Sequence, residues 1–131
     1  MLETLNITRM AAALADHAAS RMDQVARNVA QADTPGYKAM DLPDFAQVYE
    51  AGPPDGMRDG MRATRPGHVL SAPSTAQAIA QPAAGEAQHN GNTVSLEREM
   101  VKSASVRQEH DMALAVYSHA RDILRASLGR K

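Results

Sequence analysis

The sequence is poor in the residues that build a self-sufficient core. It has no Trp and one Phe, and Leu, Ile, Val and Phe together make 21 of 131 residues, about 16%. A chain below roughly 20% struggles to bury enough apolar surface to offset its ordering entropy. The hydrophobic fraction still reaches 44%, because 25 residues are Ala. With a net charge of −1, this composition indicates helices that need partners rather than a compact enzyme.

Other absences exclude whole classes of protein. Without Cys, the chain forms no disulfides and no thiolate metal sites. No apolar run approaches the roughly 18 residues of a membrane-spanning helix, so no direct transmembrane span is expected. The first residues lack the basic region and apolar stretch of a cleaved secretory signal, and none is expected. No segment is basic enough to indicate nucleic-acid binding.

Pro and Gly divide the chain into three parts. All seven Pro and seven of the eight Gly lie within residues 35–91, and the eighth Gly is Gly129. Because Pro breaks helices and Gly weakens them, we expect a mainly α fold. Two long helices, in residues 1–34 and 92–131, would pack as an antiparallel, coiled-coil-like pair. The middle part would form a turn motif followed by Pro/Gly-rich loops or short strands.

The first helix is expected to run from about Thr4 or Thr8 to about Ala32. Its apolar side chains recur in steps of three and four, and several repeat at 11 residues, which keeps a stripe nearly straight. The stripe is narrow, as for a seam that receives another helix. It comprises Ile7, Met10, Leu14, Ala18, Met22, Val25 and Val29.

The end of this helix carries a turn signal. Thr34 precedes Pro35, which disfavours helical backbone at Thr34. Pro35-Gly36 fits a type II turn, in which Pro fixes φ at the second position and Gly accepts φ > 0 at the third. Tyr37 and Lys38 then lead into an extended stretch.

The second helix is expected to start at Ser95 as N-cap, with Glu97 and Glu99 in its first turn, and to reach about Leu128, with Gly129 after its end. Its second half carries two adjacent apolar rows, which one other helix cannot cover. We therefore expect intermolecular packing. The rows are Met112, Val116, Ala120 and Ile123, and Leu114, Tyr117, Leu124 and Leu128.

The middle part gives weaker local signals. Two consecutive Asp-Gly-Met-Arg units, at residues 55–62, indicate a turn-rich loop. Val69-Leu70 could form a short strand, and residues 75–80 a weak helical turn.

No constellation of residues points to catalysis or metal binding. His110 and His119 are nine positions apart on one helix and face opposite sides, so they cannot share an ion. His17 and Ser20 could touch, but Asp16 points about 100° away from His17, which does not make a triad. We expect no catalytic, cofactor-binding or metal-binding residues, and an enzyme is the least favoured of the alternatives.

Residues 28–38, Asn-Val-Ala-Gln-Ala-Asp-Thr-Pro-Gly-Tyr-Lys, resemble the signature of bacterial flagellar axial proteins, which form the rod and hook. The match departs at Gln31, where the family usually has Asn. Three further stretches resemble the members that form the proximal rod. They are Asp41-Leu-Pro-Asp-Phe45, Arg65-Pro-Gly-His68 and Asn92-Thr-Val-Ser-Leu-Glu-Arg-Glu-Met100. A sister proximal rod protein is the near alternative, but its Ala-Tyr-x-Ala-Asn element is not reproduced in residues 112–117.

The resemblance implies a structural subunit of the flagellar basal body. It would polymerise helically through its terminal helices, join the membrane ring to the rest of the rod and transmit torque. The implied location is the periplasmic rod, reached through the flagellar type III export apparatus. The implied partners are other copies of the chain, other rod proteins, the rod–ring adaptor FliE, the membrane-ring protein and the export apparatus.

On this hypothesis the free chain is at most partly folded, and burial of its seams between subunits offsets the ordering entropy. An ordinary intramolecular hairpin is the alternative for the apolar residues, and a soluble hairpin that serves as an export adaptor or chaperone is the alternative function. The turn would be fixed by Asn28, Thr34, Pro35, Gly36 and Tyr37. Subunit packing would use Ile7, Leu14, Val25, Val29, Met100, Leu114, Tyr117, Leu124 and Leu128.

Overall fold

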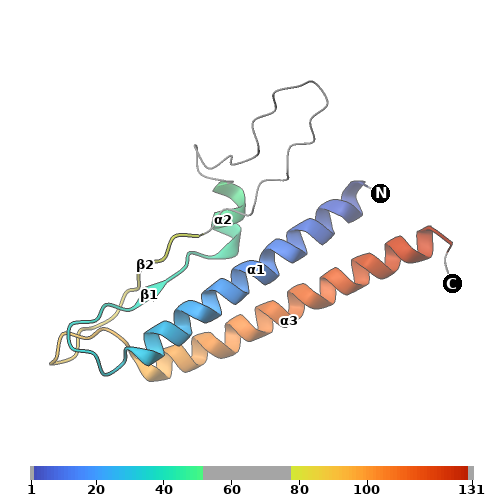
Figure 1. Ribbon diagram of the computed structural model, residues 1–131. Coiled ribbons are helices and arrows are strands. Elements are labelled where there is room, and N and C mark those ends of the chain that lie inside the picture. The colour runs from blue at the N-terminus through green and yellow to red at the C-terminus, as the bar shows by residue number, and fades with distance from the viewer. Residues whose placement is uncertain (1, 52–77, 130–131) are drawn as a thin grey trace, which may run out of the picture.

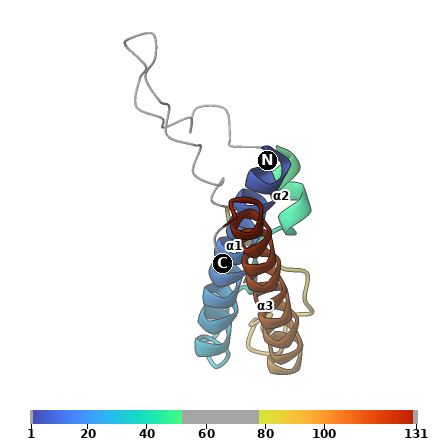
Figure 2. The ribbon, with the colours of Figure 1, turned by 90° about the vertical axis from the view of Figure 1, so that its right-hand side faces the viewer.

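Two long helices form an antiparallel hairpin in the computed structural model, which describes residues 2–51 and 78–129. Helix α1 and helix α3 lie side by side, with both chain termini at one end and the chain reversal at the other (Figures 1 and 2). A short helix, α2, and two short strands lie along one side of this hairpin, with β1 in contact with α1 (Figure 1). The elements are α1 (Leu2–Ala30), β1 (Met40–Asp41), α2 (Phe45–Ala51), β2 (Gln81–Pro82) and α3 (Leu96–Ser127). The expected fold class is confirmed.

The caps of α3 form as the sequence indicates. Ser95 is the N-cap, and its Oγ accepts a hydrogen bond from the backbone N–H of Arg98 at 3.4 Å. Gly129 has a φ of +66°, the left-handed conformation expected just after a helix. Helix α1 ends at Ala30, two residues before the expected Ala32, because the chain already enters turns at Gln31.

The middle part forms short strands, one of the two expected alternatives, and also a helix that the sequence did not predict. β1 and β2 pair antiparallel, with Met40 opposite Pro82 and Asp41 opposite Gln81. Helix α2 forms in a stretch that has no Pro or Gly, between Pro43 and the following Gly-Pro-Pro. Residues 78–80 are not helical, whereas residues 75–77, Val69-Leu70 and the Asp-Gly-Met-Arg units lie outside the described residues.

The seam between α1 and α3 consists of small residues spaced by seven. Side chains in these rows are at most 4% exposed, and a spacing of seven gives the left-handed packing of a coiled coil. The inner seam therefore differs from the 11-residue stripe, since the larger Ile7, Met10 and Val29 are 40–42% exposed. Ala side chains allow the two helices to approach closely. The seam residues are Ala11, Ala18 and Val25 on α1 and Val106, Ala113 and Ala120 on α3.

Within the described part of the chain, no helix combines the length and the apolar character needed to cross a membrane.

Candidate assembly site

Asn28, near the end of α1, binds three separate segments through its side chain, which is fully buried. Its Nδ2 donates to the Met40 carbonyl oxygen at 2.7 Å and to Glu99 Oε2 at 3.1 Å. Its Oδ1 accepts hydrogen bonds from Met40 N at 3.2 Å, Gln24 Nε2 at 3.2 Å and the Tyr37 hydroxyl at 3.3 Å. One amide thus ties α1 to α3 and to the strand that follows the turn.

Asn92 caps the end of α1 from about sixty residues away. Its fully buried Nδ2 lies 3.0, 2.7 and 2.9 Å from the carbonyl oxygens of Gln31, Ala32 and Thr34. These carbonyls belong to the turns that follow α1, and the Asn92 side chain gives them a hydrogen-bond donor. Its Oδ1 accepts from Val94 N at 2.7 Å, which also orders the entry into α3.

Glu99 places a carboxylate inside the hairpin, only 2% exposed. A buried charge is destabilising unless it is paired and hydrogen-bonded. Asn28 supplies the hydrogen bond, and Lys102 Nζ lies 3.4 Å from Glu99 Oε1. Asn28, Tyr37, Asn92 and Glu99 together form a polar hub that closes the reversal end of the hairpin.

An ion cluster fastens β1 to both long helices through Asp41. Asp41 Oδ1 lies 3.2 Å from Arg21 Nε, and Asp41 Oδ2 lies 2.9 Å from Lys102 Nζ. Burial raises the pKa of Asp41, but the hydrogen bonds and charges of Lys102 and Arg21 outweigh it and hold the pKa below its ordinary value. Burial lowers the pKa of Lys102, but Asp41 reverses this and holds it above its ordinary value. Both groups therefore stay charged through the neutral range.

The turn itself has the geometry that its residues indicate. Gly36 has a φ of +74°, and Tyr37 N donates to the Thr34 carbonyl oxygen at 3.3 Å. The N–H of Gly36 donates to the Asn90 carbonyl oxygen at 2.9 Å, which ties the turn to the segment entering α3. At the departure from the family signature, Gln31 Oε1 accepts from Thr34 Oγ1 at 2.6 Å.

Asp16, His17 and Ser20 do not form a catalytic arrangement. Ser20 Oγ donates to the backbone carbonyl of Asp16 at 3.0 Å. His17 Nε2 lies 3.0 Å from the Pro43 carbonyl oxygen. The hydroxyl and the imidazole are thus each engaged with backbone.

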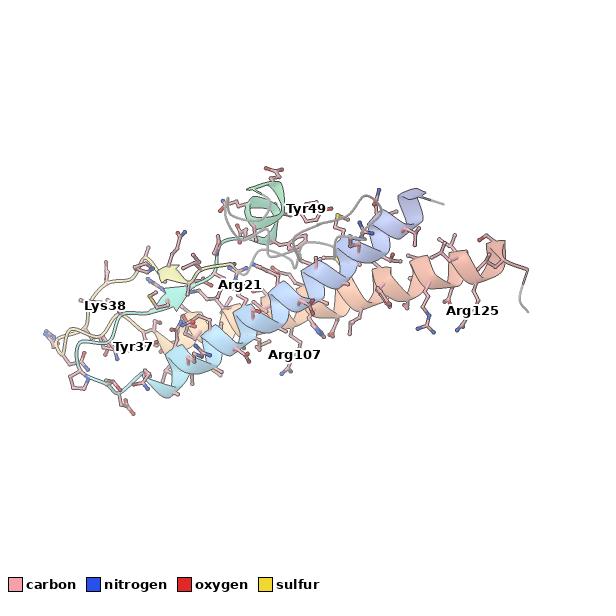
Figure 3. All side chains as sticks on the ribbon, turned by 45° about the horizontal axis from the view of Figure 1, so that its top comes forward. Arg21, Tyr37, Lys38, Tyr49, Arg107 and Arg125 are labelled. Atoms are coloured by element: carbon pink, nitrogen blue, oxygen red, sulfur yellow. The ribbon has the colours of Figure 1, made fainter. Side chains whose placement is uncertain are left out.

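The outer surfaces of both long helices carry hydrophobic side chains that the hairpin leaves exposed. Side chains project from the whole outer face of α3, along which Arg107 and Arg125 also lie (Figure 3). On α1 the exposed apolar residues are Leu5, Ile7, Met10 and Val29. In the second half of α3 they are Met112, Leu114, Val116, Tyr117, Ile123 and Leu128, each 38–69% exposed.

Comparison with known proteins identifies the family. No family model matches the chain. The flagellar basal body rod protein FlgB of Agrobacterium fabrum is 29% identical over 116 residues, which cover 85% of this chain and 84% of that protein. FlgB proteins of Escherichia coli K12 and Shigella flexneri are each 36% identical over 112 residues, or 76% of either chain. The chain belongs to the FlgB family of flagellar basal body rod proteins. The relatives favour FlgB over the sister rod protein FlgC.

The structure places the expected packing residues of this FlgB-family chain in three environments. Ile7, Val29, Met100, Leu114, Tyr117 and Leu128 are exposed, whereas Leu14 and Leu124 are half-buried. Val25 is 4% exposed and enclosed in the seam, so it supports the single hairpin and offers no surface to another subunit.

The expected turn residues lie together at the reversal, but the turn motif alone did not indicate the residues that bind them. The sequence places Glu99 in the first turn of the second helix, and both Asn92 and Glu99 lie in a stretch that resembles the family, but neither signal predicts that they bind the turn. Glu99 precedes Val106 by seven residues, so a search for seven-residue spacing on α3 would have placed it on the inner face.

Replacing Gly36 with Val is expected to destabilise the hairpin by about 1–2 kcal/mol, because a β-branched residue disfavours positive φ. No atom of the described residues, apart from the chain neighbours of Gly36, lies within 4 Å of a Cβ built there, so the effect is expected from the backbone conformation. Gly36→Asn is the matched control, because Asn tolerates the left-handed region. In thermal unfolding followed by circular dichroism, the midpoint temperature should be highest for the unmodified chain, lower for Gly36→Asn and lowest for Gly36→Val. Equal midpoints for the two variants would contradict the turn argument, as would normal motility of cells carrying Gly36→Val.

Proposed function

We propose that this chain is a structural, non-catalytic subunit of the proximal rod that polymerises helically through the outer faces of its terminal helices. The proposal rests on the distribution of apolar side chains around the second half of α3. Relative to the seam row, Val116 and Ile123 lie about 60° to one side, whereas Tyr117 and Leu114 lie about 40° and 100° to the other. Helix α1 covers only the row between them. Two further neighbours are needed to cover both flanks.

Burial of these flanks supplies the driving force for assembly. Full burial of one large aliphatic or aromatic side chain is worth about 1.5–3 kcal/mol. Several such side chains per subunit can offset the entropy of ordering the terminal ends of the helices. The polar hub holds the opposite end of the hairpin closed, so in the free chain the order is greatest there and grows toward the termini on assembly.

Membership of the FlgB family supports a proposed place in the basal body. The subunit would join the membrane ring to the rest of the rod and transmit torque within the periplasm, after export by the type III apparatus without a cleaved signal. Its partners would be other copies of itself, other rod proteins, FliE, the membrane-ring protein and the export apparatus. Residues 1–34 and 92–131 would form the axial core, and residues 35–91 would lie outside it.

Two single substitutions test the two flanks separately. Leu114→Asp and Ile123→Asp each place a charge on one flank, and we expect each to abolish rod assembly and swimming while export and the helical circular dichroism signal remain. Ala115→Asp is the matched control, since Ala115 is exposed on the same half of α3 and lies about 100° around the helix from both Leu114 and Val116. Normal assembly of either flank variant would contradict packing through that flank. A discrete one-to-one complex without a role in filament growth would instead favour the adaptor or chaperone function.

A further inference from the structure

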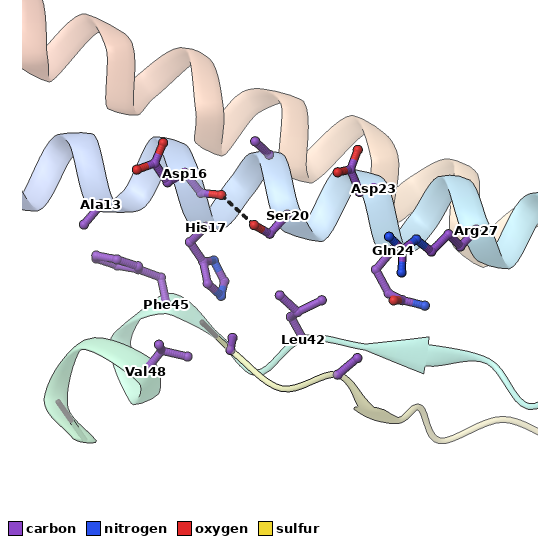
Figure 4. Close-up of a pocket in the computed structure, with 13 residues that line it drawn as sticks. Ala13, Asp16, His17, Ser20, Asp23, Gln24, Arg27, Leu42, Phe45 and Val48 are labelled. Atoms are coloured by element: carbon purple, nitrogen blue, oxygen red, sulfur yellow. Dashed lines mark hydrogen bonds between the residues drawn. The ribbon is translucent and has the colours of Figure 1, made fainter. Parts of the chain in front are cut away.

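His17 lies between α1 and the arm, which is defined here as residues 40–51 and includes β1 and α2. Its side chain is 7% exposed. Its Nε2 lies 3.0 Å from the Pro43 carbonyl oxygen, and its ring meets the Phe45 ring edge-on, with centroids 5.7 Å apart (Figure 4). The imidazole is thus enclosed where the arm turns into α2.

The hydrogen bond fixes which nitrogen carries the proton in the neutral ring. A carbonyl oxygen can only accept, so His17 Nε2 carries the hydrogen and Nδ1 is left as a bare acceptor. Nδ1 is buried and has no hydrogen-bond partner among the described residues. Protonation would therefore create a buried N–H and a positive charge with no acceptor in the described surroundings, which is strongly unfavourable.

Charged groups from all three neighbouring elements face the ring, and they act in opposite directions. Arg21, one turn further along α1, opposes protonation, whereas Glu109 on α3 and Asp44 on the arm favour it. Both carboxylates are already engaged, with Asp44 Oδ1 at 3.4 Å and Glu109 Oε2 at 3.9 Å from Arg21 Nη1. Burial is the largest effect and lowers the pKa of His17 below its ordinary value, although the hydrogen bond to Pro43 opposes it.

Among the described residues, few other contacts hold α2 in place. The Tyr49 ring contacts the Phe45 ring at a tilt, and Tyr49 is itself 50% exposed. A cavity of about 740 Å³ opens between α1 and the arm and is lined by His17, Phe45 and Val48, among others (Figure 4). Asp16 also lines it, beside His17. The ring therefore has space into which it can turn once its bond to the arm is broken.

We propose that His17 is an acid-sensitive latch, which docks α2 on α1 when neutral and releases it when protonated. Docking disfavours protonation of His17. Neutral His17 therefore stabilises the docked state fully at a pH above the ordinary histidine pKa of about 6.5, and docking weakens as the pH falls below that value. The equilibrium constant for docking can fall by at most about tenfold per pH unit, because one proton is bound. It stops falling once the pH is below the pKa that His17 has in the docked state. The polar hub contains no histidine, so the reversal end stays closed while α2 departs. The latch belongs to the single chain and does not depend on rod assembly.

Titration of the full-length chain by NMR between pH 7.5 and 4.5 tests the latch. The ring signals of His17 report protonation, and hydrogen exchange of the α2 amides together with the Phe45 ring shifts reports docking. We expect both to change with one midpoint below 6.5, while the Met40 amide, which bonds to Asn28, keeps its protection. Titration of His17 near its ordinary value with α2 still docked would overturn the proposal, as would α2 protection that does not vary with pH.

Two variants separate the latch from general acid effects. His17→Gln keeps an amide donor for the Pro43 carbonyl and cannot titrate, so α2 should stay docked throughout the range. His119→Gln, at an exposed position on α3, should behave as the unmodified chain. An unchanged transition in His17→Gln would overturn the proposal. If His17→Gln is undocked at every pH, the unmodified chain provides the test. Equal midpoints for His17 protonation and α2 release would then support the latch, and different midpoints would overturn it.

Discussion

Replacing Asn28 with Ala is expected to destabilise the hairpin by about 3–5 kcal/mol, a large part of the 5–15 kcal/mol typical of a folded domain. The loss exceeds that of one hydrogen bond because the substitution strands buried partners. Met40 loses both its N–H and C=O contacts to the amide, the Tyr37 hydroxyl loses its acceptor, and the Glu99 carboxylate loses its hydrogen bond. Urea unfolding followed by circular dichroism measures the change. Asn6→Ala, at an exposed position on the same helix, should stay within about 0.5 kcal/mol.

A pair of variants that exchanges the amide and the carboxylate between positions 28 and 99 tests the contact between Asn28 and Glu99 directly. Asn28→Asp keeps the shape and the acceptor oxygen but removes both donors and sets a carboxylate against Glu99. It should therefore be at least as destabilising as Ala at neutral pH. Adding Glu99→Gln restores a donor and an acceptor across the two helices. The double variant should recover part of the stability, though not all, because the Met40 carbonyl still lacks its donor.

The double-mutant comparison has a clear contrary outcome. If Asn28→Asp with Glu99→Gln is no more stable than Asn28→Asp alone, the two side chains do not interact across the hairpin. A loss under 1 kcal/mol for Asn28→Ala would mean that water replaces the amide and that the hub does not close this end.

Both ends of α3 and, to within two residues, the end of α1 could be predicted from the sequence because local chemistry determines them, whereas α1 begins at Leu2 and not at the expected Thr4 or Thr8. The exclusion of Pro and Gly delimits two long helices, Ser95 caps the second, and Gly36 and Gly129 adopt the left-handed conformation that other residues disfavour. Each of these signals lies within a few residues of its effect. The short helix α2 could also have been found, since the stretch after Pro43 is free of breakers, but the Pro- and Gly-rich surroundings masked it.

The inner seam and the hub could not be predicted in the same way, because they depend on the register of two distant segments. Asn28 and Glu99 are 71 positions apart and meet only when the hairpin has closed. A search for large apolar side chains also ranks Ala18 and Ala113 low, although close approach of two helices selects them. The larger residues lie outside, on the flanks proposed for assembly.

Replacing Ala18 with Leu tests the seam, and we expect it to destabilise the hairpin by about 3 kcal/mol, the upper end for overpacking. Ala18 is fully buried, and the seam residue Ala113 on the facing helix is 1% exposed. The added methylene and methyl groups have no room between two helices at this separation, so α1 and α3 must move apart or tilt. Such a movement also lengthens the contact between Asn28 and Glu99, which adds to the cost of the overpacking itself.

Ala12→Leu is the matched control, since it adds the same side chain to the same helix at an exposed position. Leu and Ala both favour helix, so a difference between the two variants reports packing and not propensity. The seam also sets the angle at which the flanks of α3 meet other subunits. Ala18→Leu should therefore impair rod assembly even under conditions where circular dichroism shows the chain still helical, whereas Ala12→Leu should keep its stability. Equal unfolding midpoints for the two variants would mean that the helices of the free chain are not held at Ala–Ala distance, and that the close seam forms only within the rod.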